Sequence, residues 1–295
     1  MAMIENRKRK NFVALTLVAP FVIVFLVFFF YPTAKMVQLS FTDAPLIGDG
    51  NWVGFDNYIR LMSDRLFKTS VWNNAYFILL TVIPTTVIAL CIALAINRLK
   101  GGMQAFVMVL FFLPYVLPVS VVTQIWAWML DFQYGVLQPL LAAITGKPVA
   151  VFRNPDWVMP VIAAITIWWT NGFNVLLFIA GLRNIPSELY EAAALDGATR
   201  GQMFRRLTWP LLWPVTALIL TLQLILQLKI FDQIYLLSGG GPFNSSYVLL
   251  MQVYREAFQL NNGGYSSAIA TVLFVLIAVV SILQFQILRV GGRRS

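Results

Sequence analysis

Six long apolar runs set the strongest limit on how this chain can fold. Each holds about twenty residues or more, the length that an α-helix needs to cross a hydrocarbon core of about 30 Å. Because 59% of the 295 residues are hydrophobic and only 11% are charged, the chain lacks the polar surface of a soluble protein of this length. The pattern predicts an all-α polytopic membrane protein with six transmembrane helices. The runs are Phe12–Tyr31, Ala75–Ile96, Met103–Leu130, Trp157–Leu182, Leu211–Leu237 and Ser267–Leu288.

Two of these runs have features that bear on their structure. The first follows the basic cluster Arg7–Lys10, is longer than the apolar part of a signal peptide and lacks a small-residue cleavage site after it. We therefore expect a retained first helix that starts in the cytosol. The third contains Pro114 and Pro118, and proline in a membrane helix frees a backbone carbonyl and favours a kink. This kink would be either static or a hinge.

The basic residues are concentrated at the N-terminus, near residue 100, in residues 183–210 and at the C-terminus. With six spans, these four segments lie on one side of the membrane and account for the whole net charge of +9, whereas the other side is balanced. The positive-inside rule makes the basic side cytosolic. The distribution predicts a multi-pass protein of a bacterial or archaeal plasma membrane, with both termini in the cytosol. It also explains the basicity without nucleic-acid binding.

The residue types exclude several kinds of chemistry. Histidine is absent, which removes the usual side chain for acid–base and metal chemistry. The single cysteine, Cys91, cannot form an internal disulfide and is expected to be a small buried hydrophobe. Gly146 and Lys147 are followed by Pro148, where a phosphate-binding loop needs Ser or Thr. We therefore expect no catalytic residue, no ATP site, no cofactor and no metal site in this chain.

A polar segment, Ile185–Pro210, separates the fourth and fifth runs and has the pattern of two short helices. Pro186 suits the first position of a helix, and Glu188 suits its positive first turn. Gly197 supplies the stop for this first helix. Because the segment is held between two membrane spans, it predicts a rigid docking element.

The second helix of this segment has its own start and stop. Thr199 and Gln202 are spaced as a capping box. We expect the helix to end at Arg205 and Arg206 and to be stopped by Pro210.

The segment resembles the EAA loop of ABC importer permeases, and its spacing is complete across twenty positions. Leu207 and Trp209 stand where isoleucine and leucine are usual, which is a mild departure. An ordinary amphipathic cytosolic hairpin is the alternative interpretation. The residues that carry the resemblance are Glu191, Ala192, Ala193, Gly197 and Pro210.

Two further fragments, WVGFDNYIRL at residues 52–61 and FDQIYLLSGGGP at residues 231–242, resemble the carbohydrate-uptake branch of this family. The resemblance then covers nearly the whole chain. It implies a type I ABC importer permease fold in one transmembrane domain, residues 1–295. Residues 70–290 would form the core, residues 1–35 an N-terminal addition, and residues 183–210 the cytosolic coupling loop.

The resemblance also implies partners and a cargo. The chain would enclose half of a pathway for a sugar or related polyol, beside a second homologous permease subunit. Two cytosolic ATPase subunits would carry ATP and magnesium, and an external binding protein would deliver the cargo. The first helix of the loop would lie in a groove on an ATPase. The residues implied at this contact are Leu189, Glu191, Ala192, Ala193, Leu195, Asp196 and Gly197.

Polar residues within the fourth and fifth runs are the candidates for a substrate path, because polar groups in spans face the bundle interior. Amide and hydroxyl groups beside aromatic rings suit a neutral polyol. The alternative is that these groups only hold helices together. The candidates are Gln223 and Gln227 in the fifth run and Thr166, Trp169, Thr170, Phe173 and Asn174 in the fourth.

Lys229 and Asp232 are the only charged residues well inside a predicted span. At positions i and i+3 of one helix they would pair, which lowers the cost of either charge in the membrane. We expect a structural pair or an outer gate element. The rival hypothesis is a secondary transporter or channel that works alone and uses this pair to couple an ion.

Overall fold

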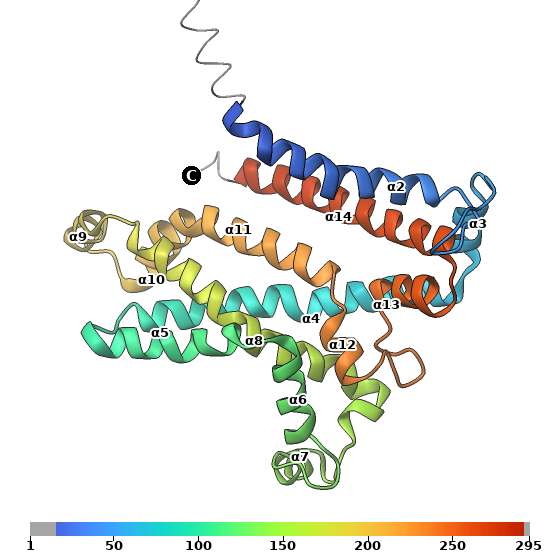
Figure 1. The fold of residues 1–295 in the computed structure, drawn as a ribbon. Coiled ribbons are helices and arrows are strands. Elements are labelled where there is room, and N and C mark those ends of the chain that lie inside the picture. Colours follow the sequence, from blue (N-terminus) through green and yellow to red (C-terminus); the bar gives the residue numbers. More distant parts are fainter. Residues whose placement is uncertain (1–15, 292–295) are drawn as a thin grey trace, which may run out of the picture. The chain divides into compact units, whose positions relative to one another are not determined.

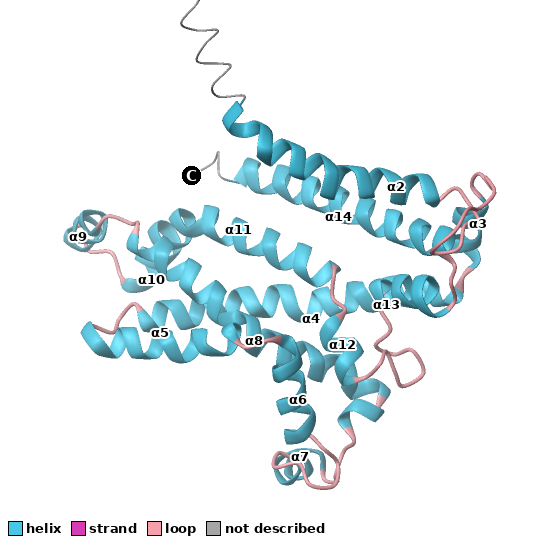
Figure 2. Cartoon of the chain, viewed as in Figure 1, coloured by secondary structure: helices cyan, strands magenta, loops and turns pink. Residues whose placement is uncertain are grey.

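The structure is a computed structural model that describes residues 16–291, with side chains described up to residue 286. Within this range the chain is helical, and its single β pairing is the isolated bridge between Thr42 and Trp52 (Figure 2). The all-α prediction is confirmed. The basic cluster Arg7–Lys10 lies outside the described residues.

Five helices of the described chain are long and apolar enough to cross a membrane, and a bent helix pair supplies a sixth span if it is counted as one. The prediction of six spans is therefore met if the bent helix pair is counted as one broken span. The five continuous helices are Thr16–Leu39, Arg65–Ile96, Pro155–Arg183, Arg200–Leu228 and Gly263–Gln286.

The chain divides into two compact units, and the first comprises the described residues up to Ser63 and Val253–Leu273. Its first helix passes through a π-helical turn, η1 (Leu26–Phe30), into α2 (Tyr31–Leu39), and buries none of its side chains in the chain. The following loop is closed by Asn57 of α3 (Asp56–Ser63), whose Nδ2 donates to the carbonyl of Thr42 at 2.8 Å. The unit also holds η4 (Arg255–Gln259) and the start of α14 (Gly263–Gly291).

The second unit, Asp64–Gln252 with the described residues from Phe274 onward, is built on α4 (Arg65–Ile96) (Figure 1). Asp64 caps this helix by accepting the N–H groups of Leu66 and Phe67 at 2.7 and 3.3 Å. Helices α8 (Pro155–Arg183) and α11 (Trp209–Leu228) pack on α4, and α5 (Gly101–Val116) packs on α8. The shorter elements are α6 (Val119–Met129), α7 (Gln138–Thr145), η2 (Val151–Arg153), α9 (Ser187–Leu195), α10 (Arg200–Met203), η3 (Phe204–Thr208), α12 (Asp232–Leu237) and α13 (Leu249–Tyr254).

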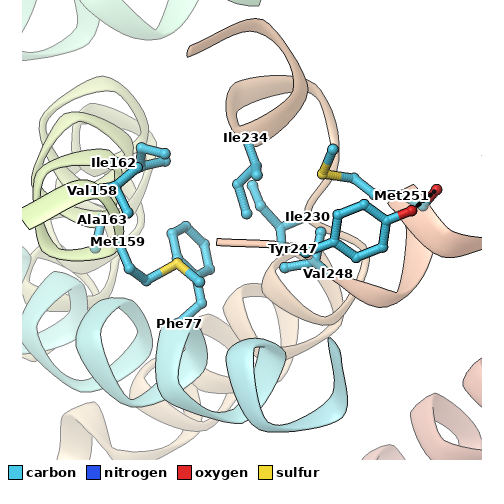
Figure 3. Packing of buried hydrophobic residues seen from close by; sticks show 10 residues of the cluster. All are labelled: Phe77, Val158, Met159, Ile162, Ala163, Ile230, Ile234, Tyr247, Val248 and Met251. Atoms are coloured by element: carbon cyan, nitrogen blue, oxygen red, sulfur yellow. Dashed lines mark hydrogen bonds between the residues drawn. The ribbon is translucent and has the colours of Figure 1, made fainter. Parts of the chain in front are cut away.

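Two apolar clusters hold the packed helices of the second unit together. In one, Phe77 of α4 meets Met159 of α8 and Ile234 of α12 (Figure 3). In the other, Ala89 of α4 lies among side chains of α8 and α11, including Phe178. Cys91 of α4 faces outward, so the expectation that it is buried is wrong.

The third span is broken rather than kinked. Helix α5 ends at Val116, and α6 starts at Val119 with a bend of 97°. Pro118 disfavours the helical conformation for the residue before it, and Leu117 is extended with ψ 137°. The carbonyl of Leu117, lost to the helix, accepts the Nε1–H of Trp169 on α8 at 3.1 Å. A tertiary contact therefore stabilises the break.

The fifth span starts and ends earlier than the sequence predicts. The helix that begins at Arg200 does not stop at Pro210 but continues through η3 into α11, as one span from Arg200 to Leu228. A proline removes one helical hydrogen bond, and a π-helical turn can satisfy the carbonyls that it frees. Here the N–H of Trp209 bonds to the carbonyl of Phe204, five residues earlier, just before the proline.

Candidate functional site

The first helix of residues 183–210 is α9, and local chemistry sets both of its ends. Pro186 precedes the helix as its N-cap, one position earlier than predicted, and Glu188 lies in the first turn. At the other end, Gly197 has a φ of +75°, a left-handed conformation that side chains disfavour. Its N–H bonds to the carbonyl of Ala194 at 3.0 Å, and that of Ala198 bonds to Ala193 at 2.9 Å. The predicted helix stop is present.

Helix α9 has no buried residue, and it exposes apolar side chains. Leu195 is 90% exposed and Leu189 is 41% exposed. Glu191, Ala192, Asp196 and Gly197 are also exposed, whereas Ala193 is half-buried. An apolar face of this kind, rimmed by polar groups, is typical of a surface that meets another protein.

Helix α9 is tied to the following helix by a side-chain hydrogen bond that the sequence did not reveal. The hydroxyl of Tyr190 lies 3.0 Å from the hydroxyl of Thr208, which is buried in η3. The two residues are eighteen positions apart, so no local pattern could pair them. Through this contact, α9 touches the same continuous helix that carries Gln223 and Gln227.

The start of that continuous helix is capped as the sequence predicts. The Thr199 N–H donates to Oε1 of Gln202 at 2.8 Å, and the Gln202 N–H donates back to Oγ1 of Thr199. This capping box satisfies two donors at the helix start. The turn between α9 and α10 is therefore fixed on both sides by Gly197 and by the box.

The two glutamines of α11 are buried against each other. Nε2 of Gln227 donates to Oε1 of Gln223 at 3.0 Å, and both side chains are almost fully buried. Among the described residues, no hydrogen bond joins this pair to the candidates on α8.

The candidates on α8 contact their own helix or α5. The hydroxyls of Thr166 and Thr170 each donate to the carbonyl four residues earlier, at 2.8 Å. Trp169 binds the carbonyl of Leu117, and Phe173 stacks on Tyr115 of α5 with ring centres 5.3 Å apart. Trp169 and Phe173 therefore support the broken span in this conformation.

Asn174 differs from the other candidates because it is completely buried and unpaired. Within the described part of the chain, neither amide atom of Asn174 has a hydrogen-bond partner, and the same holds for Oδ1 of Asn171 and Oγ1 of Thr85. Each such group costs about 1–3 kcal/mol. Thr85 on α4 was not expected from the sequence, because threonine in an apolar helix usually bonds to its own backbone.

The predicted pair of Lys229 and Asp232 is not formed. Helix α11 ends at Leu228, so the two residues do not share a helical face. Both side chains are exposed, and no ion pair joins them in the described part of the chain. Asn74 of α4 explains the early end, because its Nδ2 donates to the carbonyl of Leu228 at 3.2 Å. The hypothesis of a stand-alone transporter required this pair to couple an ion, and the structure does not support it.

Asn73 and Asn74 are buried amides that sequence analysis left unassigned. Asn73 donates to the carbonyls of Asn244 and Tyr247 at 2.8 and 2.9 Å, and Oδ1 of Asn74 accepts the N–H of Leu249 at 2.9 Å. They fix the segment after α12 against α4. Two neighbouring asparagines at the start of an apolar run were the available signal.

The described part of the chain is thus a helical membrane protein with several candidate spans and an exposed helical segment between two of them. Residues 74–289 match the family model of the binding-protein-dependent transport system inner membrane component, and the chain belongs to this family. It is therefore a multi-pass inner-membrane permease subunit of an ABC importer, without catalytic activity of its own. The described residues contain no group of three potential metal ligands, and no cofactor is expected.

The comparisons also identify relatives and solved structures. The chain is 34% identical to the sulfoquinovosyl glycerol transport system permease protein SmoG of Agrobacterium fabrum, over 94% of this chain and 90% of the relative. It is 32% identical to the trehalose/maltose transport system permease protein MalF of Thermococcus litoralis, over 92% of both chains. A chain from the crystal structure of a bacterial ABC transporter involved in the import of the acidic polysaccharide alginate matches with a TM-score of 0.86 and 25% identity. That match covers 98% of this chain and 99% of the other.

Proposed function

We propose that this permease subunit forms half of a pathway for a sugar or related polyol, which an external binding protein delivers. The names of the relatives support a carbohydrate cargo, because they include sulfoquinovosyl glycerol and trehalose/maltose systems. The buried amides of Gln223, Gln227 and Asn174 support a neutral hydroxylated cargo, since amides donate and accept hydrogen bonds without charge.

The observation that carries the proposal is the exposed apolar face of α9, joined to a span through Tyr190 and Thr208. We propose that α9 is the coupling helix and lies in a groove of one of two cytosolic ATPase subunits. Leu189 and Leu195 supply its apolar contacts, and Glu191 and Asp196 its charges. ATP and magnesium bind to the ATPases, whose closure moves α9 and thereby α11.

The proposed assembly has a second homologous permease subunit, which completes the pathway. Both termini lie in the cytosol, on the side of residues 183–210. Residues 70–290 form the permease core, and the N-terminal helix is an addition to it. Thr166, Trp169, Thr170 and Phe173 line the path in a conformation in which α5 and α8 separate. Lys229 and Asp232 lie at the outer end as separate charges.

The test is ATP hydrolysis by the complex in lipid nanodiscs, produced from this chain together with its neighbouring transport genes. We expect hydrolysis that rises when the external binding protein, purified with its natural cargo, is added. The proposal would be overturned if no ATPase copurifies with this chain and if proteoliposomes that contain this chain alone take up the cargo.

A further inference from the structure

A preformed pocket lies where α6 ends and η2 begins. Residues 130–134 and 150–153 line it together with Ala127, and its volume is about 470 Å³. Binding sites for small molecules usually have about 300–1,000 Å³. The pocket contains none of the polar residues of α8 and α11 discussed above.

Hydrogen bonds fix the walls of this pocket. The buried Gln138 donates through Nε2 to the carbonyls of Leu130 and Val149 at 3.2 and 3.0 Å, which ties the two lining segments together. Oδ1 of Asp131 accepts the N–H groups of Gln133 and Tyr134 at 2.8 and 3.2 Å. The pocket therefore does not depend on a ligand for its shape.

The lining combines opposite charges with aromatic rings. Oδ2 of Asp131 and the guanidinium of Arg153 have no hydrogen-bond partner among the described residues, and together their charges cancel. Phe132 and Tyr134 are largely exposed in the same stretch. The free acceptor of Asp131 and the free donors of Arg153 suit hydroxyl groups of a ligand. The rings of Phe132 and Tyr134 suit the C–H face of a sugar ring, and the net charge of zero favours a neutral ligand.

We propose that this pocket binds a pyranose ring of a neutral oligosaccharide, with Asp131 and Arg153 bonding to hydroxyls. The inference rests on the proposed function, whose topology places residues 131–156 on the outer side of the membrane. The site is where a sugar leaving the binding protein first meets this subunit, ahead of the path between the helices.

The test is saturation-transfer difference NMR on the full chain in lipid nanodiscs, with maltotriose and, separately, cellotriose as probes. We expect signals on ring protons for at least one of the two sugars. Asp131→Asn keeps Oδ1, which fixes the turn, and removes the free carboxylate oxygen. This change and Arg153→Gln each weaken binding about fivefold or more, because a hydrogen bond to a charged group is lost. Lys147→Gln removes a charge from the same outer segment outside the pocket and leaves the signals unchanged.

The proposal is overturned if neither trisaccharide gives signals above those of empty nanodiscs, or if both variants bind as the wild type does. Weaker binding of the external binding protein to the variants, with unchanged trisaccharide signals, would assign the pocket to a protein contact and overturn it too. The NMR experiment uses the chain without ATPases. A negative NMR result therefore does not bear on the ATPase test of the proposed function. Loss of that stimulation with intact sugar signals would count against the proposed function instead.

Discussion

Helix α9 and the interior of α8 break the usual rules of burial in opposite ways. On α9, Leu195 is an apolar side chain left almost fully exposed. On α8, Asn174 is a polar side chain that is fully buried and has no partner within the described structure. Each feature costs free energy in the isolated chain, and our proposal is that binding or a conformational change relieves each of them. The exposed apolar face fits a protein partner, and the buried amide fits a cargo or a second conformation.

The largest expected effect is on the exposed side of this comparison. Leu195→Asp places a charge at the centre of the proposed ATPase contact and should weaken assembly by about 2 kcal/mol or more, about thirtyfold. The chain itself should fold normally, because Leu195 buries little surface. The measurement is the fraction of ATPase that copurifies with the permease.

A matched control uses Ile144, which is 72% exposed in α7. Ile144→Asp should leave assembly unchanged. Equal amounts of copurified ATPase in wild type and Leu195→Asp would remove α9 from the interface.

On the buried side, Asn174→Leu replaces an unpaired amide with an apolar group of similar size. It should raise the free energy of unfolding by about 1–3 kcal/mol while transport falls. Asn74→Leu is the opposite case, because it breaks bonds to Leu228 and Leu249 and should lower stability by a similar amount. Thermal unfolding in lipid checks both. A shift of the two variants in the same direction would end the contrast between paired and unpaired amides.

A smaller effect is expected at the turn between α9 and α10. Gly197→Ala forces a side chain into a left-handed backbone at a cost of about 1–2 kcal/mol, although nothing lies near enough to clash. Limited proteolysis of residues 183–210 should accelerate, and ATPase stimulation should fall. Gly201→Ala, in the helical start of α10 and equally free of neighbours, should be neutral or stabilising. If both alanines behave alike, the conformation of Gly197 has no role in coupling.

The smallest effect tests the link from α9 to the span. Tyr190→Phe removes the hydrogen bond to Thr208 and should cost about 1 kcal/mol. Hydrogen exchange in α9 should speed up, and stimulation of ATP hydrolysis by the binding protein should fall about twofold to fivefold. Tyr76→Phe, at an exposed position of α4, serves as the control. If hydrogen exchange in α9 and stimulation of ATP hydrolysis are unchanged in Tyr190→Phe, this hydrogen bond does not couple α9 to α11.

The parts of the structure that local chemistry decides could be predicted from the sequence. The length of the apolar runs predicted the number of spans. Gly197 predicted the end of α9, and the spacing of Thr199 and Gln202 predicted the capping box. These features depend on residues a few positions apart, so a single chain read in order contains them.

The parts that depend on tertiary contacts could not be predicted. At the break before Pro118, the freed carbonyl of Leu117 accepts a hydrogen bond from Trp169. At the end of α11, the carbonyl of Leu228 accepts a hydrogen bond from Asn74, 154 residues away. The continuation past Pro210 depends on a π-helical turn that no motif marks. For the same reason, helical spacing grouped Trp169 and Phe173 as path residues, whereas in this structure they contact the end of α5 and Tyr115.

The most direct test of α9 as the coupling helix is the accessibility of one engineered thiol. Cys91 is the only cysteine of the chain, so Leu195→Cys in a Cys91→Ser background carries a single reactive group on α9. A membrane-impermeant maleimide is applied to inside-out vesicles that contain either this chain alone or the whole complex. We predict rapid labelling of the chain alone and strong protection in the complex. Equal labelling in both, or labelling only from the opposite side of the membrane, would contradict the placement of α9 against an ATPase.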